Sequence, residues 1–206
     1  MTICPTPLRP ALLAGLAALA LLARPAEAAE TYAFDKNHTQ IHFSYDHLGL
    51  TTQSGRFTGF DGTLVFDEQA PENSRLDVTI AAASVLTAIP PMDERLKGAD
   101  FFDVANHPEI RFKSRAVRRT GAKTGEVAGD LTIKGVTRPV MLMVTFNFSG
   151  PHPLGPVLAQ YKDVHAAAFS AHARVLRSDF KMGKFAPLTS DEIDIRIEAE
   201  LHRTKE

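Results

Sequence analysis

Apolar and polar residues alternate with a period of two along most of the chain beyond residue 30. The clearest stripe lies near the C-terminus, where Ile193, Ile195, Ile197, Ala199 and Leu201 alternate with charged residues. A period of two is typical of a β-strand, because successive side chains point to opposite faces of the sheet. Shorter stripes recur between clusters of glycine, proline and aspartate, which favour turns. The pattern predicts an all-β fold with eight or nine strands.

The other stripes predict how these strands are arranged. They are Tyr32 and Phe34; Ile41, Phe43 and Tyr45; Leu64 and Phe66; Leu76, Val78 and Ile80; Ile110 and Phe112; Val127, Leu131 and Ile133; Val140, Leu142, Val144, Phe146 and Phe148; and Val164, Ala166 and Ala168. Gly129 interrupts one stripe and predicts a bulge or a close approach of two strands. Closing the sheet covers its apolar face and removes its unpaired edges. The sequence therefore predicts a closed β-barrel of about eight strands.

Two segments interrupt the alternation. Residues 89–97 carry proline near their start and acidic residues before basic ones, which predicts one short helix. Residues 150–156 are rich in glycine and proline, so we expect a surface loop near one mouth of the barrel. We expect the excursion at residues 89–102 to close one end of the barrel or to line its entrance.

Composition and motifs narrow the classes of function. The chain has 206 residues, of which 44% are hydrophobic and 23% are charged, and its formal net charge is −1. This composition is typical of a globular protein, and a near-neutral balance lacks the electrostatic footprint of a nucleic-acid binder. The chain has no Gly-x-Ser-x-Gly elbow, His-Glu-x-x-His helix, dinucleotide-binding glycine motif or phosphate loop. The absence of these motifs lowers the expectation of an enzyme without excluding one, and the sequence assigns no catalytic residues.

The N-terminus has the pattern of a secretory signal. Arg9 precedes an apolar run at residues 11–23, which is too short to span a bilayer. The Ala-Glu-Ala sequence at residues 26–28 matches the small-x-small pattern of a signal-peptidase site. We therefore expect a signal at residues 1–28, cleaved near Ala28, and a single exported domain at residues 29–206 that contains no cysteine.

The eight histidines do not form a metal-binding motif in the sequence. His38 and His42 share one face of a predicted strand, but about 3.3 Å per residue would separate them by about 13 Å. One metal ion would also need a third ligand from His165, His172 or an acidic residue. His47 has the opposite parity to His42 and is expected to point inward. The sequence predicts no metal site.

Strand parity selects the side chains that face the barrel interior. They are Phe43, Tyr45, His47, Leu64, Phe66, Val78, Ile80, Phe112, Leu131, Ile133, Val144, Phe146, Phe169 and Ile195, to which the predicted excursion adds Phe101 and Phe102. These side chains either fill a dry core or surround a ligand cavity, and alternation alone favours the filled core. An apolar lumen rich in phenylalanine would suit a lipid chain.

Several cations are candidates for binding an anionic head group at one barrel mouth. They are Arg56, Arg95, Arg138, Arg177 and Lys181. Two or three of them at the same mouth could pair with a negatively charged group. Taken singly, each cation is better interpreted as a solvated surface charge than as a head-group ligand.

A series of short motifs resembles the YceI-like family of exported lipid-binding proteins. Residues 32–49 match its opening pattern, residues 100–103 and 107–114 its centre, and residues 129–140 (GDLTIKGVTRPV) its most specific piece. Residues 177–180 and 191–193 follow in the same order. The chain departs from the family at Lys181, where glycine is usual, and at His107, where an aromatic residue is usual.

The resemblance implies a lipocalin-like antiparallel eight-stranded β-barrel, often dimeric, that binds an isoprenoid chain such as a polyprenyl diphosphate or a polyprenyl quinone. Members are non-enzymatic, so the lipid is a ligand and no cofactor is expected. The predicted function is sequestration or carriage of such a lipid in the periplasm. Two alternatives remain open. One is a lipid hydrolase or isomerase that uses His47 with a nearby aspartate, and the other is an interaction domain with a filled barrel.

Overall fold

The computed structural model describes Met1 and residues 29–204, so the predicted signal and its cleavage site lie outside the described residues. The described chain is built mainly from strands. Its elements are β1 (Glu30–Phe34), β2 (Gln40–His47), β3 (Thr51–Phe57), β4 (Phe60–Phe66), η1 (Pro71–Asn73), β5 (Arg75–Ala81), η2 (Ala82–Ser84), β6 (Val85–Leu86), α1 (Pro90–Lys97), β7 (Glu109–Arg119), β8 (Thr124–Ile133), β9 (Val136–Pro151), η3 (Ala159–Tyr161), β10 (His165–Leu176), η4 (Arg177–Phe180) and β11 (Glu192–Arg203). No helix among these residues is long and apolar enough to cross a membrane.

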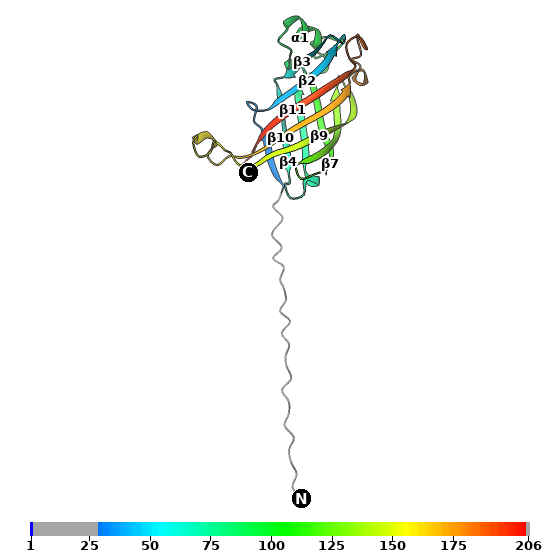
Figure 1. The fold of residues 1–206 in the computed structure, drawn as a ribbon. Helices are drawn as coiled ribbons and strands as arrows, with labels where there is room; N and C mark the ends of the chain where they lie inside the picture. The colour runs from blue at the N-terminus through cyan, green and yellow to red at the C-terminus, as the bar shows by residue number, and fades with distance from the viewer. Residues whose placement is uncertain (2–28, 205–206) are drawn as a thin grey trace.

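The strands form one antiparallel sheet that closes on itself. Its order is β1-β4-β5-β7-β8-β9-β10-β11, and pairing of β1 with β11 closes this ring of eight strands (Figure 1). β2, β3 and β6 continue the sheet from β11. The predicted antiparallel eight-stranded β-barrel is therefore confirmed. Two of the additional segments escaped prediction because β3 shows no apolar stripe and β6 has two residues.

Strand β11 is shared between two neighbours along its length. Residues 194–198 pair with β2, whereas residues 201–203 pair with β1. On its other edge, β11 pairs with β10 from residue 192 to residue 202. One edge of β11 thus holds both β1, which closes the barrel, and β2, which extends the sheet, while its other edge holds β10.

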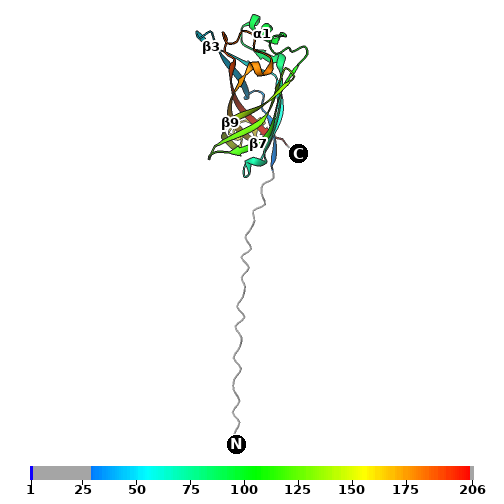
Figure 2. The same cartoon turned by 90° about the vertical axis from the view of Figure 1, so that its right-hand side faces the viewer.

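Helix α1 lies at one end of the barrel, as Figures 1 and 2 show. Proline occupies its first turn, with Asp93 near the start and Arg95 and Lys97 near the end, so the predicted short helix is confirmed. The Asp93 carboxylate accepts hydrogen bonds from the backbone N and the hydroxyl of Thr87, at 2.7 and 2.6 Å. These bonds fix the helix to the chain that leaves β6. The opposite end of the barrel carries the β7–β8 hairpin, and the two ends are called the helix end and the hairpin end.

Two predictions about side-chain direction are wrong. The register between β9 and β10 shifts by one residue between Ala168 and Phe169, so that Phe146 points inward while Phe148 is 37% exposed. A bulge changes the parity of every residue beyond it. On β10, the predicted stripe of Ala166 and Ala168 does not border the interior. Phe169, Ala171 and Val175 border the cavity instead, and Ala173 belongs to the buried core.

Gly129 marks a close approach between β8 and β7. A Cβ atom at Gly129 would lie 2.4 Å from Cζ of Phe112 and 2.7 Å from the backbone O of Lys113. No side chain fits in that space without displacing the neighbouring strand. The missing side chain lets the Phe112 ring lie across the wall of the barrel.

Candidate functional site

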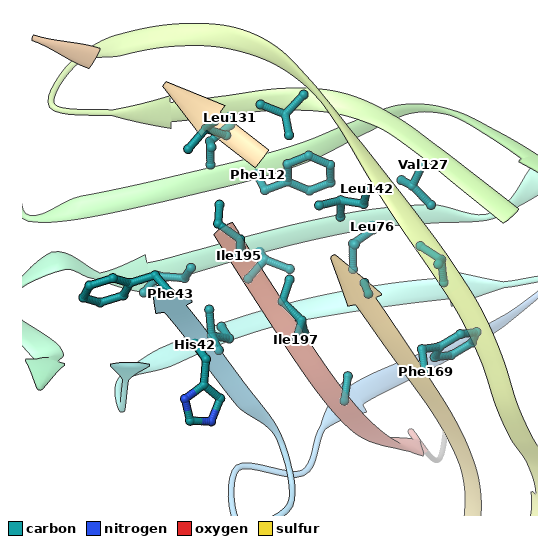
Figure 3. Close-up of a pocket in the computed structure, with 18 of the residues that line it drawn as sticks. His42, Phe43, Leu76, Phe112, Val127, Leu131, Leu142, Phe169, Ile195 and Ile197 are labelled. Carbon is teal, nitrogen blue, oxygen red and sulfur yellow. The ribbon is translucent and has the colours of Figure 1, made fainter. Parts of the chain in front are cut away.

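A cavity of about 610 Å³ lies inside the barrel. It extends from α1 to the β7–β8 hairpin, and nearly all of its wall is aliphatic or aromatic. Figure 3 shows the side chains of Phe112, Leu131 and Ile195 directed into this space, whereas the His42 ring points away. The volume is typical of sites that hold small molecules, about 300–1,000 Å³. The inward side chains therefore surround a void and do not fill a dry core.

The structure places all sixteen predicted interior residues along this cavity. Parity works because β-strands alternate strictly except at bulges. Several lining residues were not predicted; most of them lie on recognised stripes, whereas Phe57, Phe60, Ala171 and Val175 lie on none. They include Phe34, Ile41, Phe57, Phe60, Leu76, Ile110, Val127, Val140, Leu142, Ala171, Val175, Ile193 and Ile197.

The helix end is bordered by exposed apolar side chains. Leu48 is 47%, Leu50 75%, Phe185 50% and Leu188 68% exposed, and these four residues form the apolar rim. The backbone N of Leu48 donates a 3.1 Å hydrogen bond to the O of Leu188, so the β2–β3 turn and the loop before β11 lie side by side. Leu48 and Phe185 have φ angles of 63° and 68°, which bulky residues rarely adopt. The rim is continuous with the cavity, because Phe185 also borders it.

The predicted anchors lie just inside this end. The Phe102 ring packs edge-on against Phe57 with ring centroids 5.5 Å apart, and Phe57 lies 5.8 Å from Phe43. Phe101 also borders the cavity. The excursion after β6 therefore lines the helix end with aromatic rings.

The hairpin end is narrowed by three phenylalanines. The rings of Phe66, Phe146 and Phe169 pack against one another with centroid distances of 5.3–5.8 Å. Beyond them, cations border the cavity that strand parity did not identify: Arg75, Arg118, Arg119 and Lys123. Arg118 pairs with Glu126 at 2.6 Å, and Arg119 donates to backbone carbonyls of its own turn. The turn between the stripe of Ile110 and Phe112 and the stripe that begins at Val127 is the sequence signal that could have located Arg118, Arg119 and Lys123.

Arg177 organises the loop at the helix end. Arg177 is 6% exposed, and its guanidinium donates to the carbonyl oxygens of Ser190, Met182, Lys184 and Thr189, and to the Thr189 hydroxyl. Burial lowers the pKa of Arg177, opposed by the charge of Asp191. Its N–H groups are thus directed at the loop around the cavity mouth.

The other head-group candidates lie at different places. Arg95 borders the cavity and is exposed on α1. Arg56, Arg138 and Lys181 do not border it, so the structure does not bring the five cations together. Arg95 is therefore the candidate at the cavity whose charge is not already enclosed by the fold.

His47 and Tyr45 border the helix end without forming a catalytic pair. Within the described residues, the His47 imidazole has no hydrogen-bond partner, and the strand backbone forms a bridge to Thr189. Burial raises the pKa of the Tyr45 phenol, and the positive charge of Arg177 opposes this shift. No arrangement here resembles a nucleophile with an activating base.

Comparisons with known proteins agree with this geometry. The family model described as YceI-like domain matches residues 32–201. A UPF0312 protein of Pseudomonas savastanoi pv. phaseolicola is 37% identical over 183 residues, covering 88% of this chain and 91% of the relative. The crystal structure of the Campylobacter jejuni YCEI protein is 28% identical, with a TM-score of 0.68, over 78% of this chain and 90% of that chain.

A more distant structure shares the fold alone. It is a polyisoprenoid binding domain from Saccharophagus degradans, implicated in plant cell wall breakdown. It is 12% identical with a TM-score of 0.61, and the match covers 86% of this chain and 100% of that domain.

Proposed function

The chain belongs to the YceI-like family, and from this premise we propose that it binds the hydrocarbon chain of an isoprenoid lipid, or of a similar amphiphile, inside the barrel. The observation that carries the proposal is the continuous apolar cavity of about 610 Å³ between the helix end and the hairpin end. Burial of each methylene group contributes about 0.8 kcal/mol. A long chain therefore binds there with little help from polar groups.

The likeness to a polyisoprenoid binding domain supports the choice of ligand class. Prenyl chains are branched and apolar, and the aromatic and aliphatic lining of this cavity matches that surface. The interior residues chosen by parity, from Phe43 to Ile195, are the proposed contacts. A polyprenyl diphosphate and a polyprenyl quinone both satisfy this chemistry.

We place the entrance at the helix end. The apolar rim is continuous with the cavity there, while the three packed phenylalanines narrow the hairpin end. A tail that enters first leaves its polar head at the entrance, in contact with water. Arg95 borders this entrance and is the proposed partner of an anionic head group.

The proposed role is carriage or sequestration rather than catalysis. The cavity hides a water-insoluble tail, and His47 has no side-chain partner among the described residues that would activate it. We propose that the protein acts in the periplasm, because residues 1–28 have the pattern of a secretory signal. A homodimer is expected from the family resemblance, and light scattering on the purified protein measures it.

The test is the mass of whatever co-purifies with the protein from its own host. Native mass spectrometry of the mature chain should show a bound lipid, and solvent extraction should identify it. Val144→Arg places a charge on the cavity wall and should abolish retention. Met143→Arg is the matched control, because Met143 is the next residue on β9 and is 39% exposed on the outside.

A second variant keeps the proposal testable if Val144→Arg does not fold. Ala171→Trp fills the cavity with an apolar side chain and no charge, so it should fold and still exclude the lipid. A bare wild-type chain, or full lipid stoichiometry in both cavity variants, would contradict the proposal.

A further inference from the structure

Five side chains with metal-ligating groups meet on the barrel where β1 joins β11. They are Asp35, His38, His152, Glu200 and His202. We propose that this cluster, called here the seam cluster, binds one divalent transition-metal ion of the zinc class. The proposal concerns a site separate from the lipid cavity, because Glu200 and His202 alternate on β11 with Ala199 and Leu201, which border the cavity.

Three segments far apart in the sequence supply the cluster. Asp35 and His38 lie in the turn after β1, Glu200 and His202 share one face of β11, and His152 follows β9. The backbone N of Asp35 donates to the O of Glu200 at 2.9 Å, which holds the turn against β11. The excursion from residue 152 to residue 164 leaves the barrel beside the end of β11, as Figure 1 shows.

The spacing of the ligand atoms fits a small metal ion. Oδ2 of Asp35 lies 2.7 Å from Nδ1 of His38 and 3.7 Å from Nε2 of His202. Nε2 of His202 lies 2.8 Å from Oε1 of Glu200. Around a tetrahedral Zn²⁺, ligand atoms at about 2.0–2.1 Å from the metal are about 3.3 Å from one another. The observed separations bracket that value. The ligand atoms form two overlapping triads, Asp35–His38–Glu200 and His152–Glu200–His202, with the atoms of each triad within 4.8 Å of one another. Binding of one ion by Asp35, His38, Glu200 and His202 therefore requires the side chains of the two triads to close on it from their shared member, Glu200.

His152 has a different part in the cluster. The backbone N of Leu154 donates to Nδ1 of His152 at 3.1 Å, so a neutral ring carries its proton on Nε2. Nε2 then donates to Oε1 of Glu200, at 3.1 Å. The ring is 8% exposed and stacks on Tyr161 with centroids 4.0 Å apart. His152 therefore orients a ligating carboxylate, as hydrogen-bond partners of metal ligands commonly do.

The remaining donors select the class of metal. Two imidazoles and two carboxylates suit zinc and its neighbours in the first transition row, whereas Mg²⁺ and Ca²⁺ favour sites made of oxygen alone. The His38 side chain is 51% exposed and that of His202 is 26% exposed, so an ion can reach the cluster from solvent. Such an ion would link the turn after β1 to β11, where the pairing of these two strands closes the barrel.

The test uses the mature chain without an affinity tag, stripped by a chelator, and Zn²⁺ alone as the probe. Calorimetric titration should show one ion per chain, and saturating Zn²⁺ should raise the thermal unfolding midpoint. His202→Ala and His38→Ala should each weaken binding at least tenfold. His172→Ala is the control, because that histidine is exposed on β10 and belongs to neither ligand set.

A positioning role for His152 has its own readout. His152→Ala should weaken binding about tenfold but keep one ion per chain. Co²⁺ should give the intense visible spectrum of a tetrahedral site in wild type and lose it in a His38→Ala/His202→Ala variant whose circular dichroism is unchanged. Absence of Zn²⁺ binding by wild type, or unchanged affinity in that double variant, would overturn the proposal. Because lipid content does not enter the measurement, its result is independent of the proposed carrier function.

Discussion

The two ends of the cavity differ in how they are held together. At the hairpin end, Phe66, Phe146 and Phe169 pack on one another, so burial of aromatic surface closes the barrel. At the helix end, the loop before β11 is held by the hydrogen bonds of Arg177, while Leu50 and Phe185 remain exposed. Packing is cooperative and resists opening, whereas a loop held by polar bonds beside an apolar opening can yield without loss of the core. The hairpin end is therefore suited to closure and the helix end to passage.

Replacement of Arg177, at the helix end, should lower the free energy of unfolding more than any other change considered. Arg177→Met leaves several enclosed carbonyl groups without donors and should lower the free energy of unfolding by about 4 kcal/mol. Arg174→Met is the control, because the Arg174 side chain is 66% exposed and its pairs with Glu192 and Asp194 lie at the surface. That control should cost about 1 kcal/mol or less. Urea unfolding measures both, and equal midpoints would show that Arg177 does not hold the loop.

Truncation of one phenylalanine at each end compares the two directly. Phe146→Ala removes two aromatic contacts and should lower the free energy of unfolding by about 2 kcal/mol, less than for a fully enclosed ring because Phe146 borders the cavity. Phe185→Ala removes a ring that is 50% exposed and should change it by less than about 0.5 kcal/mol. The same unfolding measurement serves for both. A larger loss for Phe185→Ala would reverse the assignment of the two ends.

Charge removal at each end locates the head group. Arg95→Gln should weaken binding of a prenyl diphosphate about fivefold, as expected for an exposed ionic contact of about 1 kcal/mol. Arg95→Gln should change the affinity for an uncharged prenyl alcohol only slightly. Lys123→Gln is the matched change at the hairpin end and should leave both affinities unchanged. Fluorescent-lipid competition gives the four values, and a selective loss in Lys123→Gln would place the head group at the hairpin end.

The smallest effect is expected in the titration of two tyrosines. Burial and the neighbouring Glu30 carboxylate raise the pKa of Tyr32 to about 12, and burial raises the pKa of Tyr45. Tyr45 borders the cavity and Tyr32 does not, so a bound lipid should raise only the Tyr45 pKa further. Phenolate absorbance with and without lipid measures the shift, and Tyr45→Phe assigns it. Because both folded pKa values are raised, their contribution to stability is present below pH 10 and is lost at higher pH.

Most of the wall was predictable from sequence, because each strand has one apolar face and strict alternation. The exception at Phe148 is instructive. A bulge in β9 follows from the register with β10, and no local pattern around Asn147 signals it. Parity therefore predicts a strand reliably only up to its first irregularity.

The ends of the barrel were less predictable for a physical reason. Loops bring together residues that are distant in sequence, such as Leu48 and Leu188, and no periodicity relates them. Arg177 was expected at the mouth as a free cation, but its position in the chain gave no sign that carbonyl groups of residues 182–190 would surround it. The seam cluster was missed likewise, since Asp35 and His202 meet only when the first and last strands pair.

The shared strand β11 has a consequence for the order of assembly. Residues 194–198 pair with β2 and residues 201–203 pair with β1, so neither of these N-terminal strands finds its final neighbour until the last residues of the domain are available. Contacts of such long sequence separation slow folding. When the N-terminus emerges first, whether from a ribosome or through a pore, the barrel consequently cannot close until β11 has emerged.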